Sequence, residues 1–331
     1  MTFRKSITIF LLIAAVAGGF VFSFLKTSEP SYQGKSLSSW IRGLEYEDVT
    51  ASDEQRAALR AMGEPAVNRL IIILQSRDPA IKHKFVLYAE HHADIHNRFI
   101  APRHVIPEDV YQAQAAAALG EIGPGARTAI PALTDASTHP LYWVGARARA
   151  ALIKIRQEPI TPLLAVLEDT DSTNWNQAAF TVSYLGTNAE AAVPALVAAL
   201  QSTKPVVPRK ALFALEGIAS RPDISVPALI GLLEHKDAGI RRQAIDALCK
   251  FKGAKQQILP LLLDGMQDSD NNVWLGAAFG LESLLDKDEK RTLYVPALVN
   301  SLNNADAVIR ANATMFLKRN DPDAAARAGV K

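Results

Sequence analysis

The sequence predicts an all-α protein: an α-solenoid, a right-handed superhelix of about eight helical hairpins, behind one N-terminal transmembrane helix. Three observations lead to this prediction. Prolines recur at intervals near 33 residues, the chain is rich in Ala and Leu but only 7% aromatic, and residues 7–25 contain no charged side chain. Ala and Leu lose little conformational freedom on entering a helix, so this composition favours helices.

The apolar segment 7–25 has the length of a membrane span, because its nineteen residues would cover about 28 Å as a helix. Arg4 and Lys5 precede it, and the positive-inside rule then places residues 1–6 in the cytoplasm. We therefore expect a single-pass protein of the inner or plasma membrane. Its repeat domain would lie on the extracytoplasmic, periplasmic side, after a polar linker at 26–35.

A cleaved signal peptide is the alternative for the same segment. The sequence Ala15-Val16-Ala17 has the small-x-small form of a cleavage site. The apolar run continues past it through Phe20 and Phe24, so cleavage would leave an apolar new N-terminus. This favours the uncleaved anchor, and both alternatives export the rest of the chain.

A repeated phrase, Val/Ile-Pro-Ala-Leu followed by a helical run and a polar turn, organises the rest of the sequence. The spacings of its prolines are 31, 32, 33, 33 and 36 residues. Proline is tolerated in the first turn of a helix, where its missing N–H would have no partner. Each proline is therefore expected to open the first helix, helix A, of a hairpin. Copies begin at Ile130, Val193, Val226 and Val295, and weaker copies begin at Thr161 and Leu259.

A second signature, Asp-x-x-Val/Ile-Arg-x-x-Ala-x-x-Ala-Leu, marks the second helix, helix B, of a hairpin. The Asp can accept hydrogen bonds from the unpaired N–H groups that open a helix. The small residues let helices of neighbouring hairpins approach closely. The full match begins at Asp237, and partial matches begin at Asp270 and Asp306.

These two signatures resemble those of the HEAT-repeat superfamily, in particular the short bacterial HEAT-like repeats shared with phycobilisome lyases. The resemblance covers nearly all of residues 36–320. It implies a solenoid of HEAT-like hairpins and carries over no catalytic residue. Residues 79–107 interrupt the period as an insertion, which in solenoids maps to a loop on one face. Residues 321–331 form a polar, Ala-rich tail.

The insertion holds five of the seven histidines, so a metal-binding module is one hypothesis. His92 and His96 are four residues apart and would share one face of a helix. A zinc or copper site needs three or four converging ligands, and the sequence indicates no third one. A hydrated, polar insertion helix is the alternative.

Three tryptophans lie near the start of B helices. Trp175 and Trp274 occupy the register in which Arg241 and Arg310 lie in other hairpins, and Trp143 is one position away. In HEAT-like solenoids helix B lines the concave surface, so the resemblance implies that aligned tryptophans would anchor a partner. Packing between adjacent hairpins is the alternative.

Arginines on the B helices are the second group of candidate partner-binding residues. They would line a groove for an acidic partner. Solvated ends of amphipathic helices, balanced by nearby acids, are one alternative. For Arg241 and Arg310 the family resemblance implies another, a ladder of Arg–Asp pairs between repeats. The candidates are Arg147, Arg209, Arg241 and Arg310.

The predicted function is a non-enzymatic protein-interaction scaffold that binds a protein or peptide on its concave face without a cofactor. Without Arg4 and Lys5, the 36 basic residues become 34 and equal the 34 acidic ones, so the body has no bulk attraction to nucleic acid. The single cysteine, Cys249, excludes an internal disulfide and Cys-x-x-Cys metal sites. The family resemblance implies one alternative, a lyase-like protein acting on a bound chromophore or cofactor, which the scarcity of thiols disfavours.

Overall fold

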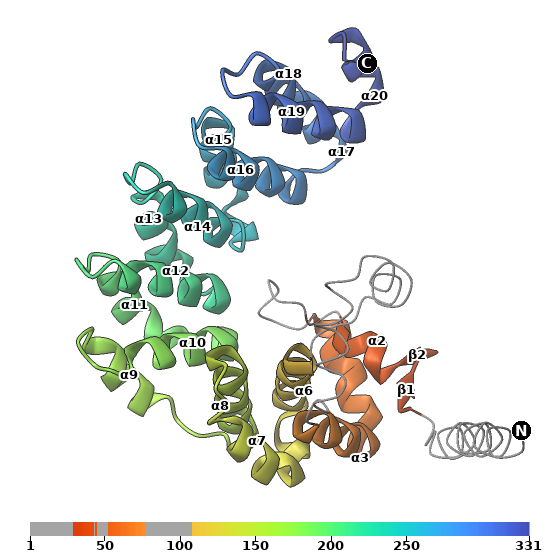
Figure 1. The fold of residues 1–331 in the computed structure, drawn as a ribbon, viewed down its shortest axis with the longest axis vertical. Coiled ribbons are helices and arrows are strands. Elements are labelled where there is room, and N and C mark those ends of the chain that lie inside the picture. The colour runs from red at the N-terminus through yellow and green to blue at the C-terminus, as the bar shows by residue number, and fades with distance from the viewer. Residues whose placement is uncertain (1–28, 43, 45–51, 77–107, 331) are drawn as a thin grey trace, which may run out of the picture.

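The computed structural model describes residues 29–42, 44, 52–76 and 108–330. In these residues the helices follow one another in chain order along one curved array (Figure 1). Each helix packs on helices that lie within a few elements of it in the sequence. This is the solenoid arrangement that the sequence predicts.

The described part begins with a short antiparallel ribbon in the segment expected as a linker, 26–35. Strand β1 (Ser31–Tyr32) pairs with β2 (Lys35–Ser36). Gln33 and Gly34 between them both have positive φ, which is the backbone of a tight hairpin turn. This ribbon corrects the expectation of a purely helical fold.

The first helices are α2 (Leu37–Arg42) and α3 (Asp53–Gln75). Helix α3 is kinked at Gly63, whose φ of 60° and ψ of −145° are not helical and favour glycine. Pro65 follows directly in the next turn. Gly63 therefore ends one helical segment, and Pro65 lies at the start of the next.

From residue 108 on, helices alternate between the two positions of a hairpin. The A helices are α7 (Ile130–Ala136), α9 (Thr161–Glu168), α11 (Val193–Ala199), α13 (Pro222–Ile230), α15 (Lys255–Gly265) and α18 (Val295–Ser301). The B helices are α6 (Glu108–Ile122), α8 (Tyr142–Arg156), α10 (Trp175–Leu185), α12 (Val206–Ile218), α14 (Ala238–Leu248), α16 (Asn271–Leu284) and α19 (Ala307–Asn320). Short helical segments join the hairpins or end the array: η3 (Gly123–Ala129), η4 (Gly186–Ala192), η5 (Lys252–Ala254), α17 (Lys287–Glu289), η6 (Lys290–Tyr294) and α20 (Pro322–Arg327).

Sequence signals account for where most of these helices begin. Proline lies in the first turn of α7, α9, α11 and α18, as the repeated phrase predicts. Asp237, Asp270 and Asp306 cap α14, α16 and α19 by accepting hydrogen bonds from backbone N–H groups of the first turn. Helices α13 and α15 begin earlier than predicted, so Pro227 and Pro260 lie inside them.

The A and B helices lie on different sides of the curve. Figure 1 shows α9, α11, α13, α15 and α18 along the outer side and α10, α12, α14, α16 and α19 along the inner side. Consecutive B helices pack on one another from α6 to α16, and α19 packs on α16. The inner side is therefore a continuous wall of B helices, which we call the inner face.

The apolar interior divides into two cores that meet at α8. The N-terminal core runs from Leu37 to Ile155, and the C-terminal core runs from Ala146 to Ala325. Within α8, Ala148 belongs to the first core, whereas Ala146 belongs to the second. One helix thus joins both cores, as expected for an array whose units bury their apolar faces against their neighbours.

The structure corrects the predicted localisation. Among residues 29–42, 44, 52–76 and 108–330, no helix combines the length and the apolar composition needed to cross a bilayer. Helix α3 is long enough with 23 residues, but it is kinked at Gly63 and carries several charged side chains. On this finding the predicted single-pass membrane protein with an extracytoplasmic repeat domain is wrong as stated. Residues 7–25, on which that prediction rested, lie outside the described residues.

Candidate partner-binding face

The structure places Trp175 and Trp274 in the core and not on the inner face. Their exposed fractions are 2% and 0%. The indole N–H of Trp175 donates to the Leu167 carbonyl at 3.0 Å, and that of Trp274 donates to the Ser301 hydroxyl at 3.1 Å. Trp274 thus ties α16 to helix α18 of the next hairpin, as the packing alternative expects, whereas Trp175 ties α10 to helix α9 of its own hairpin. Trp143 in α8 is partly buried.

Two of the candidate arginines form ion pairs from one hairpin to the next. Arg209 donates to Asp237 at 2.6 Å, and this hydrogen bond lowers the pKa of Asp237. Arg241 donates through Nε and Nη2 to both carboxylate oxygens of Asp268 at 2.8 Å, and this pairing raises the pKa of Arg241. The family resemblance implies an Arg–Asp ladder at Arg241 and Arg310, and the pair Arg241–Asp268 agrees with it at the first of these positions. We call Arg209–Asp237 and Arg241–Asp268 together the Arg–Asp ladder.

Arg310 lies in the last B helix, beyond these pairs. Its Nη1 donates to the carbonyls of Asn304 and Ala305, each at 2.7 Å. These bonds hold the loop before α19 against that helix. The arginines at 209, 241 and 310 therefore all have hydrogen-bond partners within the array.

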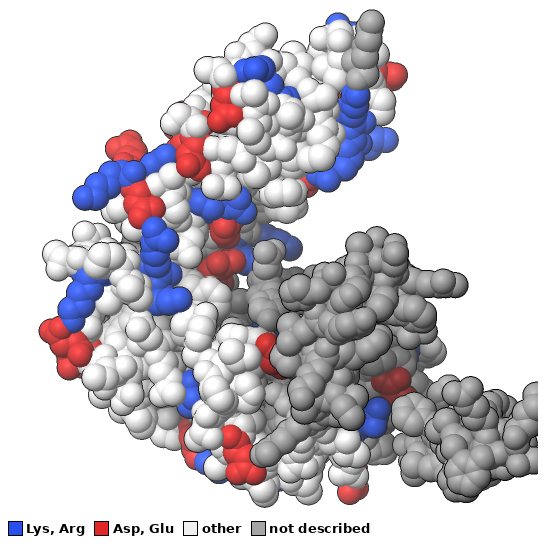
Figure 2. All heavy atoms as spheres, viewed as in Figure 1, with Lys and Arg blue, Asp and Glu red and all other residues white. Residues whose placement is uncertain are grey.

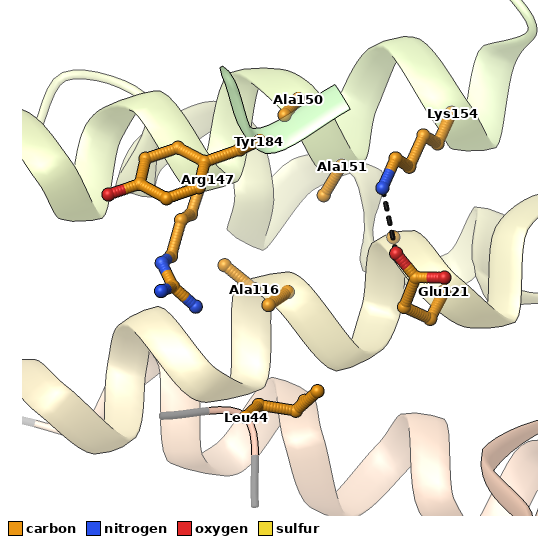
Figure 3. A pocket seen from close by; sticks show the side chains of 10 residues that line it. Leu44, Ala116, Glu121, Arg147, Ala150, Ala151, Lys154 and Tyr184 are labelled. Atoms are coloured by element: carbon orange, nitrogen blue, oxygen red, sulfur yellow. Dashed lines mark hydrogen bonds and ion pairs between the residues drawn. The ribbon is translucent and has the colours of Figure 1, made fainter. Parts of the chain in front are cut away.

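Arg147 differs from the other three because it is buried without a described acidic partner. It extends from α8 into a small pocket between α6, α8 and α10, and its guanidinium carbon lies 4.6 Å from the ring centre of Tyr184 (Figure 3). The residue is 6% exposed, and no described group accepts a hydrogen bond from its Nε. Burial raises the pKa of Tyr184, and the adjacent positive charge of Arg147 opposes that rise without cancelling it.

The pocket around Arg147 has a volume of about 20 Å³, which is room for about one water molecule. The carboxylate that lines it, Glu121, accepts a hydrogen bond from Lys154 at 2.7 Å and lies 4.0 Å from Arg56. Figure 3 shows the Lys154–Glu121 pair to one side and the guanidinium of Arg147 to the other. Glu121 is therefore paired with other cations.

Sequence reasoning missed a row of aromatic side chains that crosses three successive B helices. Tyr142 of α8, Phe180 of α10 and Phe213 of α12 follow one another with ring centres 4.5 and 5.0 Å apart. Tyr184 lies 6.1 Å from Phe213, and Lys210 Nζ lies 4.6 Å from the ring centre of Phe180. We call the following six residues the aromatic-cation site: Tyr142, Phe180, Tyr184, Phe213, Arg147 and Lys210.

The register of the B helices contains a signal that could have found this row. Phe180, Phe213, Phe279 and Met315 all lie five residues after the register position that holds Trp175 in α10. Five residues turn a helix by about 140°, so a core position at the start of a B helix is followed by one on its exposed side. Accordingly, Phe279 is 47% and Met315 is 52% exposed, whereas Phe180 is 7% exposed because Tyr142, Phe213 and Lys210 lie against it.

Arg149, two residues after Arg147 in α8, carries a second, partly buried guanidinium. Its Nη1 donates to the Ser137 carbonyl at 2.6 Å and its Nε to the Thr181 hydroxyl at 3.3 Å, but its Nη2 has no partner in the part that the structure describes. Burial lowers the pKa values of Arg149 and Lys210. In Figure 2, by contrast, basic side chains over the middle of the array stand next to acidic ones.

The other sequence candidates do not form a reactive centre in the described residues. Burial raises the pKa of Cys249 to about 12, so its thiolate is scarce at neutral pH, which counts against thiol chemistry in the lyase-like alternative. His92 and His96 lie outside the described residues, and their metal-binding role stays a prediction. Among the residues that are described, no three His, Cys, Asp or Glu side chains gather as metal ligands.

A comparison with known protein families supports the repeat class. A model of HEAT repeats matches residues 193–282, which extend from α11 into α16 within the C-terminal core. A search of curated proteins gives no significant match. The family match therefore supports the HEAT-repeat superfamily for this part of the array.

Solved structures resemble the chain in their helical arrangement. An engineered protein is 19% identical, covers 79% of this chain and 97% of its own, and has a TM-score of 0.40. A computationally designed armadillo repeat protein for modular peptide recognition is 19% identical over 60% of this chain and 92% of its own, with a TM-score of 0.41. Human deoxyhypusine hydroxylase is 16% identical over 75% and 84%, with a TM-score of 0.36.

Proposed function

We propose that this chain is a non-enzymatic interaction scaffold whose inner face binds a protein or peptide partner. The observation that carries the proposal is a series of large apolar side chains left exposed on the B helices. Tyr142, Phe279 and Met315 are 55%, 47% and 52% exposed, and Phe213 is partly exposed between them. Aromatic side chains and Met are enriched at protein–protein interfaces, where a few such residues provide most of the binding energy.

The shape of the array supports the same proposal. The B helices form a continuous wall along the inner side of the curve (Figure 1), and stacked repeats of this kind offer an extended concave surface. The pocket beside Arg147, with about 20 Å³, is far smaller than the roughly 300 Å³ at which small-molecule sites begin. In the described residues the inner face therefore suits a polypeptide better than a cofactor.

Photo-crosslinking from the full-length chain in cells tests this proposal. A crosslinking amino acid at Met315, on the exposed side of α19, is expected to capture the same partner reproducibly. The matched control is Val299 in α18, which is 36% exposed and lies on the outer side of the same hairpin. Equal yields of the same crosslinked product from both positions, or no product from Met315, would contradict binding on the inner face.

A further inference from the structure

The aromatic-cation site has more positive charge than the described carboxylates neutralise. Arg147 enters it from α8, and Lys210 enters it from α12. The described interactions of these two side chains are with aromatic residues, and none is with a carboxylate. A buried charge destabilises a fold unless a counter-charge pairs with it.

The Arg–Asp ladder shows that this shortage of acids is local. Arg241 has both carboxylate oxygens of Asp268 within hydrogen-bond distance, one hairpin further along. The guanidinium of Arg147 instead lies against the ring of Tyr184, and the nearby Glu121 pairs with Lys154. In the described residues, the arginines of the Arg–Asp ladder are therefore paired with carboxylates, whereas the cations of the aromatic-cation site are not.

We propose that the aromatic-cation site binds an acidic, extended segment of a partner protein, an inference that rests on the inner face being the binding surface. A Glu or Asp side chain of the partner accepts hydrogen bonds from the guanidinium of Arg147 where it borders the pocket, with Lys210 providing a second positive charge. An apolar side chain next to it packs on the exposed ring of Tyr142, which is 55% exposed.

The dimensions of the site favour a side chain over a free small molecule. The pocket holds about 20 Å³, so the oxygens of a carboxylate can enter it while the rest of the ligand stays outside. The rings of Phe180 and Phe213 have centres 5.0 Å apart; Phe180 is buried within the row, and Phe213 is partly exposed. A polypeptide can use the pocket together with the exposed parts of Phe213 and Tyr142.

Peptide binding to the purified full-length chain tests the proposal. One fluorescently labelled peptide alternates Glu with Phe, and its matched control carries Gln in place of every Glu. We expect the Glu peptide to bind about tenfold more tightly or better, with an affinity that falls as salt is raised. Equal affinities for the two peptides would overturn the requirement for an acidic partner.

Variants of the chain locate the binding to this site. Arg147→Gln and Lys210→Gln are each expected to weaken binding of the Glu peptide by about tenfold. The matched control Lys236→Gln, in an exposed loop, is expected to leave the affinity for the Glu peptide unchanged. Arg147→Gln removes an unpaired buried charge, so circular dichroism is expected to show an intact fold. Arg147→Lys keeps the charge but loses the guanidinium fork, and an intermediate affinity is expected.

Two further results separate this inference from the proposed function. If free glutamate competes as well as the Glu peptide at equal concentration, the site takes small carboxylates and the polypeptide proposal is overturned. If a crosslinked partner is captured at Met315 but its yield is insensitive to Arg147→Gln, Lys210→Gln and salt, the acidic site is wrong and the scaffold function stands. If neither crosslinked partner nor peptide binding is found, both fail.

Discussion

The N-terminal and C-terminal cores are built from the same kind of hairpin but are joined by different contacts. Alanines such as Ala115 and Ala148, both fully buried, fill the contact between α6 and α8. In the C-terminal core, larger side chains such as Trp274 fill the interior, and the pair Arg241–Asp268 links successive hairpins. Alanine packing and the Lys154–Glu121 pair therefore join α6 to α8, whereas a buried indole and an Arg–Asp pair join the hairpins at α14 and α16.

The contacts that join the hairpins determine which arginines lack a described acidic partner and can therefore bind an acidic partner protein. The Arg–Asp pairs join α12 to the loop before α14 and α14 to the loop before α16. Helix α8 belongs to both cores, and there Arg147 lies against Tyr184. The aromatic-cation site thus begins at α8, where the N-terminal and C-terminal cores meet.

The largest expected effect is the loss of an anchor in the C-terminal core. Trp274→Ala is expected to lower the free energy of unfolding by about 3–5 kcal/mol, because a fully buried indole leaves a cavity. It also removes a hydrogen bond to Ser301 and a ring contact with Phe316, whose centre is 5.9 Å away. Urea unfolding followed by circular dichroism measures the loss, and hydrogen exchange is expected to rise in α16 and α19 more than in α6.

Phe279→Ala is the control for this prediction. Phe279 lies five residues further along the same helix but is 47% exposed, so its removal is expected to cost about 1 kcal/mol or less. Similar losses for Trp274→Ala and Phe279→Ala would show that Trp274 is not an anchor of the core. Equal increases of exchange in α6 and α16 would show that the two cores unfold as one.

The sequence predicted the hairpins well because their signals are local. A proline in the first turn and an Asp cap act within a few residues, as Pro194 and Asp270 do at the starts of α11 and α16. The burial of a side chain between hairpins is not encoded locally. Trp274 could be placed on a B helix, but its partner Ser301 lies 27 residues further along the chain, in the next hairpin. Arg147 likewise lacks a described acidic partner because the nearby Glu121 pairs with Lys154, and Glu121 and Lys154 are 33 residues apart in the sequence.

A smaller effect is expected where two B helices of the C-terminal core touch. In Gly217→Ala the new Cβ would lie 2.7 Å from the carbonyl oxygen of Ser183 and close to its hydroxyl. A backbone oxygen cannot rotate away, so we expect a loss of about 1–3 kcal/mol despite the higher helix propensity of Ala. Thermal unfolding monitored by circular dichroism gives the change in Tm.

Gly120→Ala is the matched substitution in the N-terminal core. There the new Cβ would lie 3.1 Å from Cα of Ala151, a milder contact that a small helix shift relieves. The gain in helix propensity, up to about 1 kcal/mol, offsets it, so the net change is expected to be small. A larger loss for Gly120→Ala than for Gly217→Ala would contradict our expectation that α10 and α12 pack more closely at Gly217 than α6 and α8 do at Gly120.

The smallest expected effect concerns acid stability of the ladder. Burial raises the pKa of Asp268, but hydrogen bonds from Arg241 and the Asp270 N–H outweigh it and hold the pKa below its usual value. A lowered pKa in the folded state gives stability that is present above the unfolded value, near 4, and lost as pH falls through the folded value. Asp268→Asn is therefore expected to cost about 1–2 kcal/mol at pH 7. This deficit should shrink as the pH falls below about 4.

Urea unfolding of the wild type, Asp268→Asn and Arg241→Gln between pH 7 and pH 3 measures this contribution. Arg241→Gln breaks the same pair from the other side, so its deficit is expected to shrink over the same pH range. The double variant should lose less than the sum of the two single variants, because both remove one interaction. A deficit of Asp268→Asn that stays constant to pH 3, or additive losses in the double variant, would mean that the pair does not join the hairpins of the C-terminal core, and the contrast with the alanine contact of α6 and α8 would then rest on apolar packing alone.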